Sequence, residues 1–167
     1  TEFIEKVDFL AGAFPARFGD KASSVMDISM RRGNSEQRML SADLGMGGIG
    51  VMGEGPTFGD GTFLFSARRS FFDLIARSRD MTAIPSMYDL YGKLTWSIGN
   101  NTLQWNTLTG QDDIEVEPDE DDEDDTTYMT YESSVLVSGI TLKSVLSRNL
   151  YAETTLSYAD NGWDMYM

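Results

Sequence analysis

The sequence predicts an all-β protein whose antiparallel strands follow one another along the chain. Apolar and polar residues alternate with a period of two over most of the length after residue 35, which is the pattern of strands with two different faces. Short segments rich in Gly and Asn interrupt the alternation and predict tight turns. About seven strands are expected in this part of the chain.

The alternation is clearest in residues 88–98, "YDLYGKLTWSI", which place Leu90 and Trp96 on one face and Lys93 and Thr95 on the other. The other expected strands are 37–45, 48–54, 61–69, 102–110, 134–145 and 150–158. The chain then runs into a turn-like "ADNGWDMYM" and stops, so the sequence is expected to be an excerpt of a longer protein.

The connections between these strands alternate between short and long. The turn "GNN" at 99–101 is very short, whereas 70–86 and 111–132 are long. Within the first long connection, "SFFDLIARSRD" at 70–80 predicts a short helix, and Pro85 marks an extended restart. Up-and-down barrels of bacterial outer membranes have short turns at one end and long loops at the other, so the pattern favours an antiparallel transmembrane β-barrel portion, an open fragment of about seven strands.

Composition excludes several classes of function. The chain has no Cys and no His, which removes Ser-His and Cys-His catalysis and the common zinc sites. Of its 27 acidic residues, eleven lie in residues 112–125, so the net charge of −14 is concentrated there and argues against a nucleic-acid partner. No pair of carboxylates is marked as facing one cleft. An enzyme and a cofactor are therefore not expected.

Residues 4–33, "IEKVDFLAGAFPARFGDKASSVMDISMRRG", resemble the C-terminal end of the plug domain of TonB-dependent outer-membrane receptors. That family typically reads I-E-x-I-E-V-L-x-G-P, then Y-G, then A-x-G-G-V-I-N-I-x-T-K-x-G. The match runs without a gap, but Ser23 and Ser24 stand where many members have Gly-Gly, and Ala11 stands where many have Arg. The positions that carry the resemblance are Gly12, Phe18, Gly19, Ala22, Val25, Ile28 and Gly33.

The resemblance implies a preceding plug domain and an incomplete barrel. Residues 1–34 would be the C-terminal part of the plug, and residues 35–167 the N-terminal strands of the barrel. Gly12 and Gly19 would permit tight turns where bulkier residues would clash. The parent protein would reside in the bacterial outer membrane, in contact with its lipid, and take up a scarce nutrient such as a siderophore, cobalamin or an oligosaccharide. Energy would come from the TonB–ExbB–ExbD complex, through a segment not present here.

A soluble secreted β-sandwich or adhesin-like binding module is the competing hypothesis, because two-faced strands serve that fold equally well. The discriminating observation is where the apolar face points. It faces lipid in a transmembrane barrel and a second sheet in a sandwich. The aromatic residues on that face are expected to form an interfacial girdle or core packing rather than a sugar platform; they are Tyr88, Trp96, Trp105 and Tyr158.

The acidic run is expected to be a solvated loop. Counting strand directions from a periplasmic start places the loop 111–132 outside the cell, where eleven carboxylates remain hydrated. Clustered carboxylates also make weak candidates for Ca²⁺ ligands, namely Asp119, Asp121, Asp122 and Asp124, although the spacing is not that of an EF-hand. Arg68 and Arg69, at the end of an expected strand, are candidates for contact with an anionic ligand or for ion pairs with nearby acids.

Overall fold

The chain forms two compact units, Thr1–Arg32 and Gly33–Met167. The computed structural model describes residues 3–16, 18–19, 23–45, 47–72, 83–116, 118 and 128–166. Its regular elements in these ranges are nine β-strands, in agreement with the all-β prediction. No helix among these residues is long and apolar enough to cross a membrane.

The first unit contains a two-stranded antiparallel sheet. Strand β1 (Ile4–Leu10) pairs with β2 (Val25–Met30), so that Val7 lies opposite Ile28 and Leu10 opposite Val25. In the described part of the chain, neither strand hydrogen-bonds to the larger sheet. The opening segment therefore forms a small sheet that, among the described residues, shares no strand pairing with the strands that follow.

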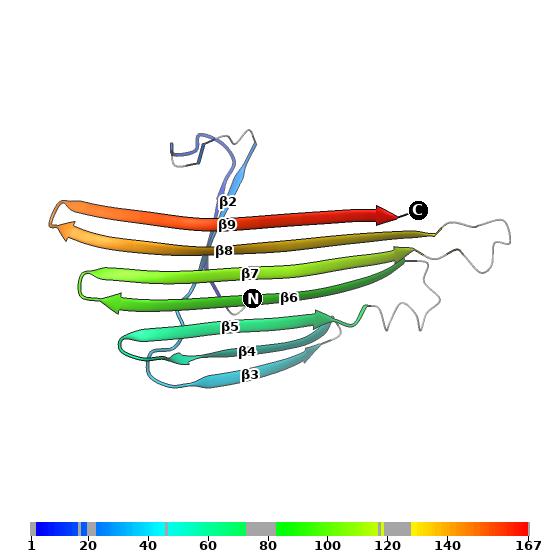
Figure 1. Ribbon diagram of the computed structural model, residues 1–167, viewed down its shortest axis with the longest axis horizontal. Coiled ribbons are helices and arrows are strands. Elements are labelled where there is room, and N and C mark those ends of the chain that lie inside the picture. The colour runs from blue at the N-terminus through cyan, green and yellow to red at the C-terminus, as the bar shows by residue number, and fades with distance from the viewer. Residues whose placement is uncertain are drawn as a thin grey trace. The chain divides into compact units, whose positions relative to one another are not determined.

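The second unit is a seven-stranded antiparallel sheet in which each strand pairs with the next one along the chain (Figure 1). The strands are β3 (Met39–Gly45), β4 (Gly48–Pro56), β5 (Gly61–Ser70), β6 (Ala83–Ile98), β7 (Asn101–Val116), β8 (Met129–Ser147) and β9 (Leu150–Tyr166). The two edges of the sheet are β3 and β9. Because neighbours alternate in direction, these two edge strands run the same way.

The connections gather at two opposite ends of the sheet. The turns that link β4 to β5, β6 to β7 and β8 to β9 lie at one end, which we call the short-turn end (Figure 1). The links from β5 to β6 and from β7 to β8 span residues 71–82 and 117–128 and lie at the other, the long-loop end. The link from β3 to β4 spans only residues 46–47 and lies at the long-loop end, so the expected alternation of short and long connections is present after this first hairpin.

The strands at the long-loop end are longer than the sequence indicated. The prediction of a loop over 111–132 is wrong at both of its ends, because 111–116 belong to β7 and 129–132 to β8. Asp112 lies opposite Ser133 and Glu115 opposite Thr130, so main-chain hydrogen bonds form with few like charges directly opposed. Likewise β9 continues to Tyr166 where a turn was expected. The helix predicted for 70–80 falls largely on residues outside those described.

The segment before the first strand of the sheet is held by contacts with the end of β4 and the beginning of β5. The Asn34 backbone N–H donates to Glu54 Oε2 at 2.8 Å, and Asn34 Oδ1 accepts from the N–H groups of Glu36 and Gln37. A Cβ added to Gly33 would lie 2.0 Å from a backbone oxygen of β5, that of Phe63. Only glycine allows this close approach.

Candidate functional site

The two faces of the seven-stranded sheet differ in chemistry. We call the face that carries Leu90 and Trp96 the apolar face, and the face that carries Lys93 and Thr95 the polar face. Strand register extends the apolar face across all seven strands through Leu40, Leu44, Ile49, Val51, Phe63, Phe65, Leu94, Leu103, Trp105, Leu136, Ile140, Leu142, Leu156 and Tyr158. The division of residues 88–98 between two faces is as the sequence predicts.

Large apolar residues of the apolar face are exposed on inner strands, whereas the middle of the polar face is buried, including Leu64 at 1% and Tyr91 at 5% exposure. On the apolar face, Phe65 is 41%, Leu90 48% and Ile140 49% exposed, although these residues lie on inner strands rather than edges. On the polar face, Lys93 is only 7% and Thr95 only 1% exposed. Water-soluble proteins place large apolar side chains inside and leave lysine outside. An exposed apolar area of this extent marks a surface that contacts protein or membrane.

The polar face holds ion pairs between neighbouring strands. Arg68 Nε on β5 lies 3.1 Å from Asp89 Oδ1 on β6. Lys143 Nζ on β8 lies 3.8 Å from Glu153 Oε2 on β9. Of the two roles considered for Arg68, the ion pair is therefore the one that the geometry shows. Charged side chains on this face are thus paired across neighbouring strands.

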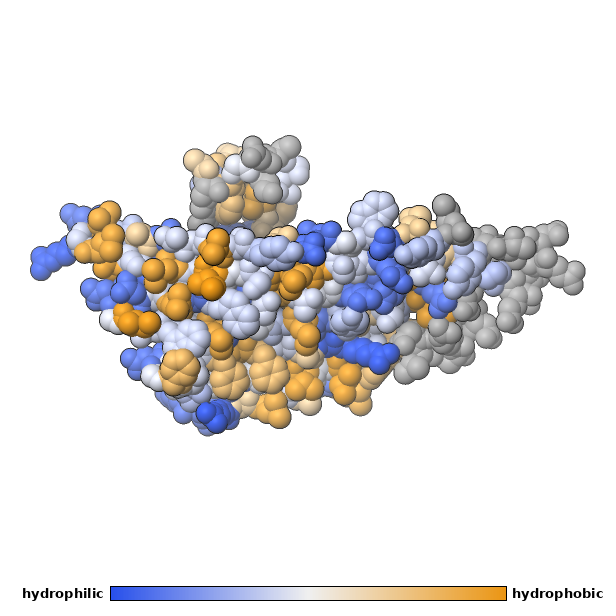
Figure 2. Space-filling model, viewed as in Figure 1, coloured by the Kyte–Doolittle hydropathy of each residue, from blue (hydrophilic) through white to orange (hydrophobic). Residues whose placement is uncertain are grey.

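The apolar face ends in a row of carboxylates toward the long-loop end. Asp113, Glu132 and Asp164 lie opposite one another on β7, β8 and β9. One row nearer the apolar residues, the Tyr88 hydroxyl donates to Gln111 Oε1, and Gln111 Nε2 donates to Asp113 Oδ1 at 3.1 Å. Figure 2 shows hydrophobic residues gathered over the strands and hydrophilic residues toward the ends. On β9 the polar residues begin two rows earlier, with Asp160 opposite Leu136.

Aromatic side chains lie along the apolar face. Tyr88 lies next to the carboxylate row, Tyr158 lies in the middle of the face opposite Ser138, and Trp96 lies near the short-turn end. Trp105 is between them, and its Nε1 donates to Ser138 Oγ at 3.0 Å. All four aromatic residues singled out in the sequence are on the apolar face.

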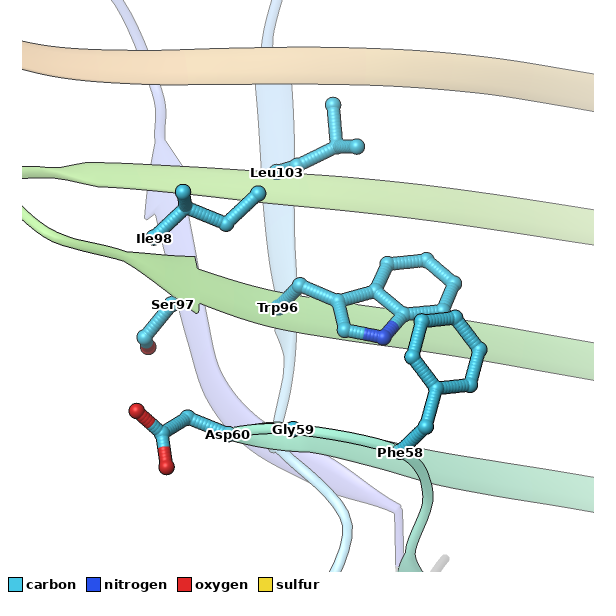
Figure 3. Close-up of a pocket in the computed structure, with 7 residues that line it drawn as sticks. All are labelled: Phe58, Gly59, Asp60, Trp96, Ser97, Ile98 and Leu103. Carbon is cyan, nitrogen blue, oxygen red and sulfur yellow. The ribbon is translucent and has the colours of Figure 1, made fainter.

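A hollow of about 390 Å³ interrupts the apolar face at the short-turn end (Figure 3). It is lined by Phe58, Gly59, Asp60, Trp96, Ser97, Ile98 and Leu103. The Phe58 ring lies over the Trp96 indole, with 5.5 Å between ring centroids. Sequence alternation places Trp96, Ile98 and Leu103 on this face, but it does not bring in the turn residues Phe58 and Asp60.

The residues that carry the resemblance have varied local roles. Gly12 has φ +155°, which disfavours other residues, whereas an added Cβ at Gly19 would meet no described atom within 4 Å. The Phe18 N–H closes a turn by donating to Pro15 O at 3.0 Å. Val25 and Ile28 lie in β2 and Gly33 at the close approach to β5. Ala22 lies outside the described residues.

The candidate Ca²⁺ ligands Asp119, Asp121, Asp122 and Asp124 also lie outside the described residues. Within the part that the structure describes, no three His, Cys, Asp or Glu side chains come close enough to hold a metal ion. Comparison with known proteins gives no match to a family model, to a curated protein or to a solved structure. Function is therefore inferred from the chemistry of the two faces.

Proposed function

We propose that the seven-stranded sheet is part of the wall of a transmembrane β-barrel in the bacterial outer membrane. The observation that carries this proposal is the burial pattern of the sheet, in which large residues of the apolar face are exposed and Lys93 and Thr95 are buried. In a transmembrane barrel the apolar face contacts lipid and the polar face lines the lumen. A β-sandwich would instead bury residues such as Leu90 and Ile140 against a second sheet, and both are about half exposed.

The dimensions of the apolar face agree with the proposal. From Leu90 to Ile98 the apolar residues of β6 extend over about 27 Å along the strand, at about 3.4 Å per residue. Strands of outer-membrane barrels are tilted by about 35–45°, so this length spans about 19–22 Å along the membrane normal. The lipid-facing band of outer-membrane barrels is about 25 Å tall and is flanked by aromatic residues. Tyr88 stands at one limit of the band and Trp96 near the other, as amphipathic rings do at a membrane interface.

The opening unit makes the proposal more specific. Residues 1–34 resemble the end of a receptor plug, and the two-stranded sheet of β1 and β2 is separate from the larger sheet. We therefore assign the chain to a TonB-dependent receptor for energised uptake of a nutrient, with the plug controlling passage through the lumen. A plug is needed because a barrel of about 22 strands has a lumen too wide for side chains to fill.

Site-directed spin labelling tests which face meets lipid. The chain has no cysteine, so a single label can be placed at Leu142→Cys on the apolar face or at Thr141→Cys, its neighbour on the polar face. In phospholipid vesicles, we expect the label at 142 to be reached by dissolved oxygen, which concentrates in the bilayer. The label at 141 should be reached less by oxygen and relatively more by a water-soluble nickel chelate.

The two positions are adjacent on one strand and lie at nearly the same depth, so each is the control for the other. Equal accessibility at 141 and 142, or a label at 142 that is shielded from both reagents, would contradict the membrane proposal. Shielding from both reagents is the result that the β-sandwich requires.

The orientation of the sheet gives a second prediction. A periplasmic start for β3 places the long-loop end, and with it residues 117–128, outside the cell. An epitope tag inserted at Asp122 in the protein expressed in a bacterium should bind antibody on intact cells, because carboxylates at this density stay hydrated and accessible. Binding only after the outer membrane is broken would show that the sheet has the opposite orientation.

A further inference from the structure

The hollow at the short-turn end is built into the sheet by glycine. Gly61 lies directly opposite Trp96, and a Cβ on Gly61 would come within 2.5 Å of the indole Cδ1 and Nε1 atoms. The indole therefore lies flat over the glycine instead of standing away from the sheet. Gly59, with φ +63°, shapes the preceding turn that carries Phe58. The hollow follows from specific backbone positions and is not a gap left by loose side chains.

The lining of the hollow is apolar along its floor and acidic at one rim. Trp96, Ile98 and Leu103 belong to the apolar face, and Phe58 adds a ring that is 76% exposed. Figure 3 shows the Asp60 carboxylate directed away from the two aromatic rings, at the turn. Within the described part of the chain Asp60 forms no ion pair. An occupant that fits this arrangement has an apolar body and a cationic end.

One buried donor in the hollow also lacks an acceptor. The Trp96 Nε1 atom is buried and has no hydrogen-bond partner among the described residues. In Figure 3 this nitrogen lies at the edge of the indole nearest Phe58. A buried N–H without an acceptor is destabilising, because its hydrogen bond to water is lost and not replaced. An oxygen-bearing ligand that displaced the exposed Phe58 ring would satisfy it.

We propose that this hollow binds a single phospholipid whose headgroup carries a primary amine, such as phosphatidylethanolamine. An acyl chain would lie against Trp96, Ile98 and Leu103, an ester oxygen would accept from the Trp96 N–H, and the ammonium group would lie near Asp60. Phosphatidylglycerol, which is anionic and has no amine, would be repelled by the same carboxylate. The inference rests on the proposed membrane location of the apolar face and adds a lipid preference at one place on it.

Quenching of tryptophan fluorescence by lipids brominated on the acyl chain tests the preference. In the variant Trp105→Phe, Trp163→Phe, Trp96 is the remaining tryptophan. In phosphatidylcholine vesicles, we expect brominated phosphatidylethanolamine to quench Trp96 about threefold more effectively than brominated phosphatidylglycerol at the same mole fraction. A preference of about threefold is what one partly exposed charge contact provides. Asp60→Asn in the same background should remove the difference.

The control places the reporter elsewhere on the apolar face. A chain with Trp96, Trp105 and Trp163 changed to Phe and with Tyr158→Trp carries its tryptophan on β9, away from the hollow. We expect the two brominated lipids to quench this control reporter equally. Equal quenching at Trp96, or a preference that persists in Asp60→Asn, would overturn the lipid site and leave the membrane location intact. Absence of quenching both at Trp96 and at the control reporter would instead overturn the membrane location and the lipid site with it.

Discussion

Lysine in place of Ile140 is expected to prevent insertion of the sheet into lipid vesicles. Ile140 is on β8, an inner strand, midway between the carboxylate row and the short-turn end of the apolar face. An ammonium group at the midplane of a bilayer costs a transmembrane barrel about 2–4 kcal/mol. The fraction of chain that becomes protected from protease on addition of vesicles should fall strongly relative to the unsubstituted chain.

Thr141→Lys is the matched control for this substitution. It places the same charge one residue away on the polar face, two residues from Lys143 and opposite Thr155. Insertion should be nearly unchanged there, because the lysine would lie on a hydrated lining. Equal loss with both variants, or loss only with Thr141→Lys, would mean that the apolar face does not contact lipid.

Gly33→Ala should destabilise the seven-stranded sheet. The new Cβ would lie 2.0 Å from Phe63 O, an atom of the main chain in β5 that cannot turn aside as a flexible side chain would. Forced overpacking of this kind typically costs about 1–3 kcal/mol. The shift should also strain the hydrogen bond from the Asn34 N–H to Glu54. Urea unfolding in detergent micelles, followed by tryptophan fluorescence, measures the loss of unfolding free energy.

Gly45→Ala serves as the comparison for this effect. Gly45 ends β3 in the same sheet, and an added Cβ would meet no described atom within 4 Å. Alanine at this position should therefore leave the unfolding free energy nearly unchanged. If Gly33→Ala were as mild as Gly45→Ala, the close approach to β5 would not be a constraint on the fold.

Period-two alternation was sufficient to predict the strands and their faces, because the positions of successive side chains on a strand depend only on local geometry. Leu90 and Trp96 fall opposite Lys93 and Thr95 in any strand that contains them. Alternation gives no information on which face is buried, since that depends on what surrounds the sheet. The exposure of Leu90 and the burial of Lys93 could be obtained only from the assembled sheet.

Strand ends and cross-strand contacts could not be predicted, because they depend on residues far away in the sequence. Asp112 and Glu115 have a low strand preference, yet they extend β7 because Ser133 and Thr130 lie opposite them on β8. The hollow depends on a pairing between Gly61 and Trp96, 35 positions apart. Glycine within a strand often marks a close approach of another group, but nothing in the sequence identified Trp96 as the partner of Gly61.

The shared direction of β3 and β9 has a geometric consequence. If these two edges met, they would form a parallel pair, so the seven strands cannot form a closed cylinder that is antiparallel throughout. A closed cylinder that is antiparallel throughout and includes these seven strands must contain an odd number of further strands. Its total number of strands is therefore even. Until both edges are paired, each presents a row of unsatisfied main-chain donors and acceptors, and such rows are templates for the addition of another strand.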